Sequence, residues 1–138
     1  MCSLDGCGSK SNLPPIVVAD ADRRAFLAGL ASLPIAAVLA DPALAQASAA
    51  RVEAVTIPTT RDRSVSLAVA YPAQPKGPAV VLIHEWWGLN DQIKAVAAEF
   101  AKEGYVAVAV DLFGRVATNA DEAKAHMQSL DPEWATQA

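Results

Sequence analysis

The sequence has 138 residues and a formal net charge of −4, from 11 basic and 15 acidic side chains. An acidic balance argues against nucleic-acid binding, which uses a basic face. The only two cysteines, Cys2 and Cys7, lie near the N-terminus, so the rest of the chain can form no disulfide framework. Few metal ligands lie near them, and we expect neither a metal site nor a cofactor.

The first elements in chain order have the layout of an export signal. Arg23 and Arg24 directly precede an uncharged apolar run over residues 25–40, and small residues follow at 43–47. This order is typical of secretory signals, and the paired arginines are typical of the twin-arginine type. We therefore predict a signal peptide over 1–45 with a long n-region, followed by a linker over 46–51. The protein would be periplasmic or secreted, with the twin-arginine (Tat) export machinery and signal peptidase as partners.

Two other interpretations of the apolar run are a permanent membrane anchor and a buried helix. A spanning helix needs about 20 apolar residues. The run is shorter than this and contains Gly29 and Pro34. No stable membrane anchor is therefore expected. The long n-region also leaves open a start codon assigned too early.

Four strands are predicted downstream. Residues 51–57 and 64–70 alternate apolar and polar side chains, which predicts a hairpin-like pair around a polar turn. Residues 79–83 and 105–110 are uninterrupted apolar runs, which indicate strands buried on both faces of a parallel sheet.

A helix is predicted between the last two strands. Apolar side chains recur there at helical spacing from Ile93 to Phe100, Asn90 or Asp91 can cap the start, and Gly104 ends it. Residues 79–110 therefore form a βαβ unit, and helices are predicted over 120–130 and from Pro132. The fold class is α/β, with an antiparallel strand pair followed by a βαβ unit of a mostly parallel sheet. One crossover helix covers only one face, so the chain behaves as part of a larger domain.

The segment 84–90 joins a strand to a helix, where open α/β sheets bind their ligands. Glu85 places a carboxylate there beside Trp86 and Trp87. A zinc motif of the His-Glu-x-x-His type is excluded because position 88 is glycine, and no Gly-x-Gly-x-x-Gly nucleotide fingerprint is present. A structural alternative is that Glu85 pairs with a nearby base while the tryptophans belong to the core.

Two linked motifs resemble the opening of the dienelactone hydrolase family. Residues 81–90, VLIHEWWGLN, and 104–115, GYVAVAVDLFGR, match its pattern of His-Glu, two bulky residues, Gly-Leu-Asn, a helix, and an Asp-Leu-aromatic-x-Arg loop. The resemblance covers residues 52–138 and is strongest over 80–115. It implies the incomplete N-terminal portion of an α/β-hydrolase fold. It also implies a carboxymethylenebutenolidase-like hydrolase whose thiol nucleophile attacks a small-molecule lactone or carboxylic ester.

The resemblance also implies roles for three residues. Glu85 matches the glutamate that contacts the nucleophilic thiol and helps control its ionisation. The backbone N–H of Trp86 matches one donor of the oxyanion hole. Arg115 matches the arginine that holds a substrate carboxylate. For Arg115, an ion pair with Asp111 or Glu122 stays open as an alternative.

The sequence departs from the family in its nucleophile. No Gly-x-Cys-x-Gly or Gly-x-Ser-x-Gly motif occurs, so we expect the nucleophile, and the Asp and His of the triad, beyond Ala138. The chain by itself is predicted to be inactive. His84 is expected to be a structural hydrogen-bonding group and His126 a surface residue. The alternative function is a small exported, non-catalytic binding domain or a decayed fragment.

Overall fold

The computed structural model describes residues 20–30, 33–59, 63–74 and 77–135. Cys2 and Cys7, and most of the predicted n-region, lie outside this part. The described elements, in chain order, are α1 (Asp20–Leu30), α2 (Leu33–Ala40), α3 (Pro42–Ala49), β1 (Glu53–Pro58), β2 (Ser64–Ala70), β3 (Ala79–Ile83), α4 (Asp91–Lys102), β4 (Val106–Asp111), α5 (Ala120–Ser129) and α6 (Pro132–Ala135).

The four strands form one mixed sheet in the order β1-β2-β4-β3. β1 pairs antiparallel with β2, and β2 pairs antiparallel with β4. β3 pairs in parallel with β4, with Ile83 opposite Val110. The predicted strand pair and βαβ unit are both confirmed. β3 forms one edge of the sheet among the strands described.

Helix α4 is the crossover between β3 and β4, and it packs on the sheet through its apolar face. Asn90 caps its start, since the side-chain Oδ1 accepts a hydrogen bond from the N–H of Ile93 at 3.1 Å. Ala97 and Phe100 are almost fully buried against Ala107 of β4. The helix ends before Gly104, whose φ of 93° is a conformation that suits glycine.

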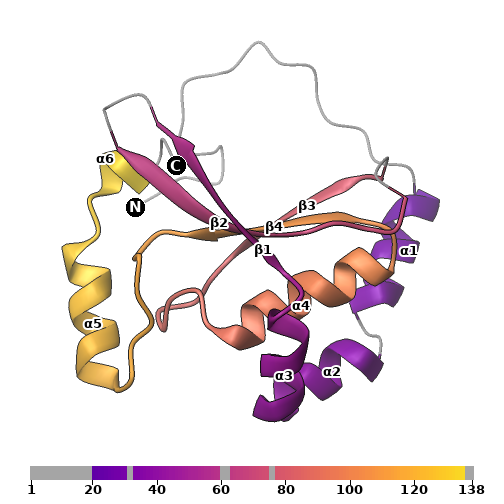
Figure 1. Ribbon diagram of the computed structural model, residues 1–138, viewed down its shortest axis with the longest axis horizontal. Helices are drawn as coiled ribbons and strands as arrows, with labels where there is room; N and C mark the ends of the chain where they lie inside the picture. The colour runs from indigo at the N-terminus through magenta and orange to yellow at the C-terminus, as the bar shows by residue number, and fades with distance from the viewer. Residues whose placement is uncertain (1–19, 31–32, 60–62, 75–76, 136–138) are drawn as a thin grey trace.

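Helices α2 and α3 lie with α4 on one side of the sheet (Figure 1). Ile35 packs in the cluster that contains Phe100, while Val38 and Ala45 pack against Ala95 of α4. Residues 33–40 of the predicted signal peptide and 42–49, which reach into the predicted linker, thus form helices that pack on α4, whereas a tether was expected at 46–51. No helix in the described ranges is long and apolar enough to cross a membrane. The signal peptide stays a prediction.

Strand β3 is exposed on its second face, so the prediction that it is buried on both faces is wrong for the described structure. Val81 and Ile83 are 62% and 69% exposed, whereas Val80 and Leu82 pack towards α4. The reason is that α2, α3 and α4 all cover the same side of the sheet (Figure 1). One crossover helix leaves the other side without a layer, as the topology leads us to expect.

Candidate active site

The predicted site residues lie at one end of the sheet. Glu85 and Trp86 follow β3, and Arg115 follows β4. Because β3 and β4 are parallel, their carboxyl ends meet at the same edge. The sheet therefore brings together the two loops that the sequence singled out.

The loop after β3 begins with a tight turn over Glu85–Gly88. The N–H of Gly88 donates to the carbonyl oxygen of Glu85 at 3.1 Å. Gly88 has a φ of 91°, and a Cβ at this position would overlap the carbonyl oxygen of Arg115. The N–H of Ala117 also donates to the carbonyl of Trp87 at 2.9 Å. These backbone contacts hold the two loops directly against each other.

The backbone N–H of Trp86 lies within this turn. Within the described residues this N–H has no hydrogen-bond partner. The side chain is 38% exposed, and its ring lies 4.9 Å from that of Trp87, measured between ring centres. No acceptor among the described residues therefore competes for this amide.

Glu85 is exposed. In the described part of the chain its carboxylate forms no ion pair. Trp86 is exposed and Trp87 is only half-buried. The structural alternative, a paired glutamate with tryptophans in the core, is therefore not what the described structure shows.

The loop after β4 is organised by Asp111. Its Oδ1 accepts hydrogen bonds from the N–H groups of Phe113, at 3.1 Å, and Gly114, at 2.8 Å. This Asx-type turn leaves Arg115 exposed. Among the residues that are placed, Arg115 pairs with neither Asp111 nor Glu122. The alternative role of Arg115, an ion pair within its own loop, is therefore not seen in the described residues.

Glu122 instead caps the region before α5. Its Oε2 accepts from the backbone N–H of Thr118 at 2.8 Å and from the Thr118 hydroxyl at 2.9 Å. The backbone hydrogen bond from Thr118 is the main cause that lowers the pKa of Glu122 from its ordinary value of 4.5, and the Thr118 hydroxyl adds to it. Asn119 completes the cap by accepting from the N–H of Glu122 at 2.9 Å.

His84 and His126 are both buried, but the sequence predicted burial of neither and a structural role only for His84. His84 is 7% exposed and hydrogen-bonded through both ring nitrogens, so its expected structural role is confirmed. His126 is 6% exposed, so its prediction as a surface residue is wrong. It lies three positions after the fully buried Ala123 on α5, and its ring packs 5.7 Å from that of Phe113, measured between centres. The i, i+3 spacing from Ala123 was the signal that could have placed His126 on the inner face.

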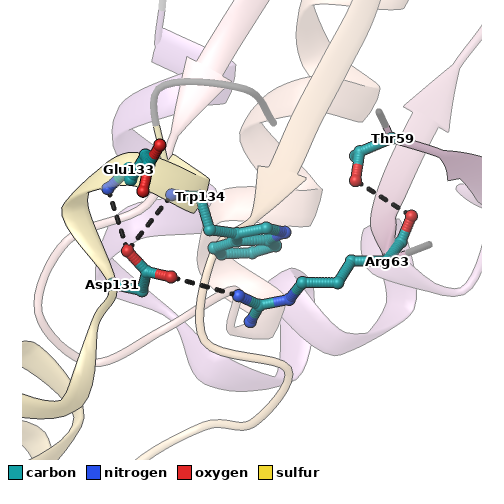
Figure 2. Close-up of polar contacts among 5 residues, drawn as sticks. All are labelled: Thr59, Arg63, Asp131, Glu133 and Trp134. Carbon is teal, nitrogen blue, oxygen red and sulfur yellow. Dashed lines mark hydrogen bonds and ion pairs between the residues drawn. The ribbon is translucent and has the colours of Figure 1, made fainter. Parts of the chain in front are cut away.

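A hollow of about 280 Å³ opens between the start of β2, the loop after β4 and α5; Arg115 lines it, whereas Glu85 and Trp86 do not. Arg63 stands at its rim. Its Nη1 lies 3.4 Å from Asp131 Oδ2, and its Cζ lies 4.7 Å from the centre of the Trp134 ring (Figure 2). This cluster joins the segment before β2 to the first turn of α6.

The described residues offer no set of side chains that could bind a metal ion. They contain no group of three or more His, Cys, Asp or Glu side chains that could hold an ion. The zinc interpretation of His84-Glu85 was already excluded by Gly88. What the site does offer is a free backbone donor, a carboxylate and a guanidinium.

Comparison with known proteins gives consistent matches. The profile of the dienelactone hydrolase family matches residues 65–137, more than half of the chain. The chain is 49% identical over 59 residues to Protein usf of Aquifex pyrophilus, covering 38% of this chain and 26% of that protein. It is 50% identical over 48 residues to a Saccharolobus solfataricus protein assigned as a carboxymethylenebutenolidase, covering 33% of this chain and 19% of that one.

Among solved structures, the chain is similar to one named m3DLH, with 27% sequence identity and a TM-score of 0.49, covering 62% of this chain and 38% of that one. The matches to the two curated relatives span about a quarter of their length or less. The described mixed sheet with its helices forms part of an α/β-hydrolase fold, and the chain belongs to the dienelactone hydrolase family.

Proposed function

We propose that this chain supplies half of the active site of a hydrolase that opens a lactone or carboxylic ester with a thiol nucleophile. The observation that carries the proposal is the N–H of Trp86, which has no partner among the residues that the structure describes and is held at the carboxyl end of β3 by the turn at Glu85–Gly88. A donor in the loop after the third strand is where α/β-hydrolases place part of their oxyanion hole.

Each of the three residues has one task in this proposal. The Trp86 N–H stabilises the negative charge that develops on the carbonyl oxygen as the tetrahedral intermediate forms. The Glu85 carboxylate lies beside the thiol and acts on its charge state, since the thiolate is the nucleophile. Arg115 holds a carboxylate group of the substrate with two hydrogen bonds.

The nucleophile itself is proposed to come from outside the printed sequence. The only cysteines are Cys2 and Cys7, which lie in the n-region of the predicted signal peptide. Among the described strands β3 is at the edge of the sheet, and Val81 and Ile83 on its second face are exposed, which supports this view. An unpaired strand edge is a template for a further strand, and a strand added there would end beside Glu85. We therefore expect no hydrolase activity from residues 1–138 alone.

Export by the twin-arginine route is part of the proposal. Arg23 and Arg24 lie exposed on α1, ahead of the apolar segment that forms α2. Replacing both with lysine should keep the protein in the cytoplasm, and N-terminal sequencing of the exported protein should begin near residue 46. Export of the Lys-Lys variant at the wild-type level would refute the twin-arginine route.

A second candidate function is a non-catalytic binding domain. The hollow beside Arg63 favours it, since Glu85 and Trp86 do not line it and Arg115 lines it together with other polar and aromatic side chains. A binding domain would show saturable ligand binding with no turnover.

The hydrolase is tested with the product of the entire reading frame, assayed on an aryl ester and a dienelactone. Wild type should turn over, and alkylation of its thiol should abolish turnover. Glu85→Gln should lower kcat/KM by about 10²-fold or more, while the control Glu53→Gln, at an exposed position on β1, should have no effect. Turnover that survives both alkylation and Glu85→Gln would refute the thiol mechanism.

A further inference from the structure

The imidazole of His84 lies buried between the ends of β3 and β4, and both of its nitrogens are engaged. Nδ1 lies 2.6 Å from the carbonyl oxygen of Glu85. The N–H of Leu112 donates to Nε2 at 3.0 Å. The ring also packs against Phe113, with 4.6 Å between ring centres. One side chain thus contacts the backbone of both loops of the candidate site.

These contacts determine where the His84 proton resides. The amide of Leu112 can only donate, so Nε2 must present its lone pair. The proton therefore sits on Nδ1, which donates it to the Glu85 carbonyl. The carboxylate of Asp111 is 3.9 Å from Nε2, beyond hydrogen-bond distance, and its nearer oxygen already accepts from two loop amides.

The Glu85 carbonyl is held from two sides. Its oxygen accepts from Nδ1 of His84 and from the N–H of Gly88, at 3.1 Å. A carbonyl has two lone pairs, so both are used. The same peptide unit carries the N–H of Trp86, and a trans peptide is planar, with its N–H pointing opposite to its carbonyl. A bond that fixes the Glu85 oxygen therefore also fixes the direction of the Trp86 N–H.

We propose that His84 is the positioning residue of this site. Its Nδ1–H, by donating to the Glu85 carbonyl, aims the Trp86 N–H at the forming oxyanion. Its Nε2, by accepting from Leu112, holds that amide in a fixed position relative to the Leu112–Arg115 loop. The inference rests on the proposed function for the catalytic task of Trp86. His84 itself does not touch the substrate. The oxyanion donor and the substrate-holding arginine are coupled because one buried ring is bonded to the backbone of both loops.

Two conservative variants separate the two bonds. The side-chain amide of asparagine reaches about as far as Nδ1, so His84→Asn can keep the bond to the Glu85 carbonyl but not the bond to Leu112. The side-chain amide of glutamine reaches about as far as Nε2, so His84→Gln can keep the bond from Leu112 but not the other. His84→Phe keeps an aromatic ring against Phe113 and removes both bonds.

The experiment is NMR of the ¹⁵N-labelled chain. Wild type should show the Nδ1–H tautomer and a coupling across the hydrogen bond between the Leu112 nitrogen and Nε2. Residual dipolar couplings report the direction of the Trp86 N–H, which should be preserved in His84→Asn and altered in His84→Gln. Exchange of the Leu112 amide should be about 2- to 10-fold faster in His84→Asn, as for the loss of one hydrogen bond, and unchanged in His84→Gln.

An Nε2–H tautomer in wild type, or a Trp86 N–H direction in His84→Gln that is the same as in wild type and His84→Asn, would overturn the inference. Either result is readable even if His84→Phe does not fold. In the active protein from the entire reading frame, His84→Gln should lower kcat about 10- to 10²-fold with little change in KM, below the 10²–10³ typical of losing an oxyanion donor outright. If the NMR couplings are as predicted but wild type hydrolyses no ester or lactone, the proposed function is refuted, while the conclusion that His84 positions the Trp86 N–H still holds.

Discussion

Replacing Gly88 with alanine tests whether the two loops of the site are held together by backbone contact. Alanine at a φ of 91° costs about 1–2 kcal/mol. The new Cβ would also overlap the carbonyl oxygen of Arg115, and relieving such overpacking costs a further 1–3 kcal/mol or so. We therefore expect Gly88→Ala to lower the free energy of unfolding by about 2–5 kcal/mol.

Gly104 offers a matched control for this prediction. Its φ is 93°, nearly the same as at Gly88, but a Cβ there would meet nothing within 4 Å. Gly104→Ala should therefore lose only the conformational part, about 1–2 kcal/mol. Urea unfolding followed by tryptophan fluorescence measures both variants. If the two variants lose the same stability, the loop after β4 does not press on Gly88 and the reasoning fails.

Three further predictions concern the core, the cap of α5 and the cluster in Figure 2. Phe100→Ala should lower the free energy of unfolding by about 3–5 kcal/mol, measured by heat or urea, because the ring is 1% exposed. The control Met127→Ala, at a side chain that is 54% exposed, should lower it little. Equal losses in the two variants would contradict the assigned core. Because the folded-state pKa of Glu122 is lowered, its stabilisation is present above the ordinary value of 4.5 and is lost as pH falls through the folded value. Glu122→Gln should therefore make the free energy of unfolding less dependent on pH in that acid range. A pH dependence equal to that of wild type would contradict the capping role of Glu122. Arg63→Ala should speed amide exchange in α6 and cost about 1 kcal/mol, since the ion pair is half-exposed and the ring contact with Trp134 adds a modest amount; unchanged exchange would mean that the cluster does not hold α6.

The sheet could be read from the sequence because its strands have strong local patterns. The predicted ranges 64–70 and 79–83 agree with β2 and β3 at both ends. The crossover helix followed from Asn90, the apolar spacing up to Phe100, and Gly104, and each of these acts locally. The loops after β3 and β4 could be placed at one edge because parallel strands end on the same side.

What the sequence could not predict depends on contacts between distant segments. The packing of Ile35 and Val38 against α4 joins parts of the chain that are far apart, and an apolar run alone does not say what it packs on. The Arg63–Asp131 ion pair spans 68 positions. The hydrogen bond from Leu112 to Nε2 of His84 joins residues 28 positions apart and forms because β3 and β4 lie side by side.

The central claim is that the loop bearing Glu85 and Trp86 serves a nucleophile from a neighbouring strand. It is tested most directly by reading the gene past the codon for Ala138. We predict an in-frame Gly-x-Cys-x-Gly within about 20–40 codons, with the Asp and His of the triad later in the frame. A stop codon at that position, or a continuing frame without a nucleophile motif, would contradict the claim and leave the non-catalytic binding domain as the better account.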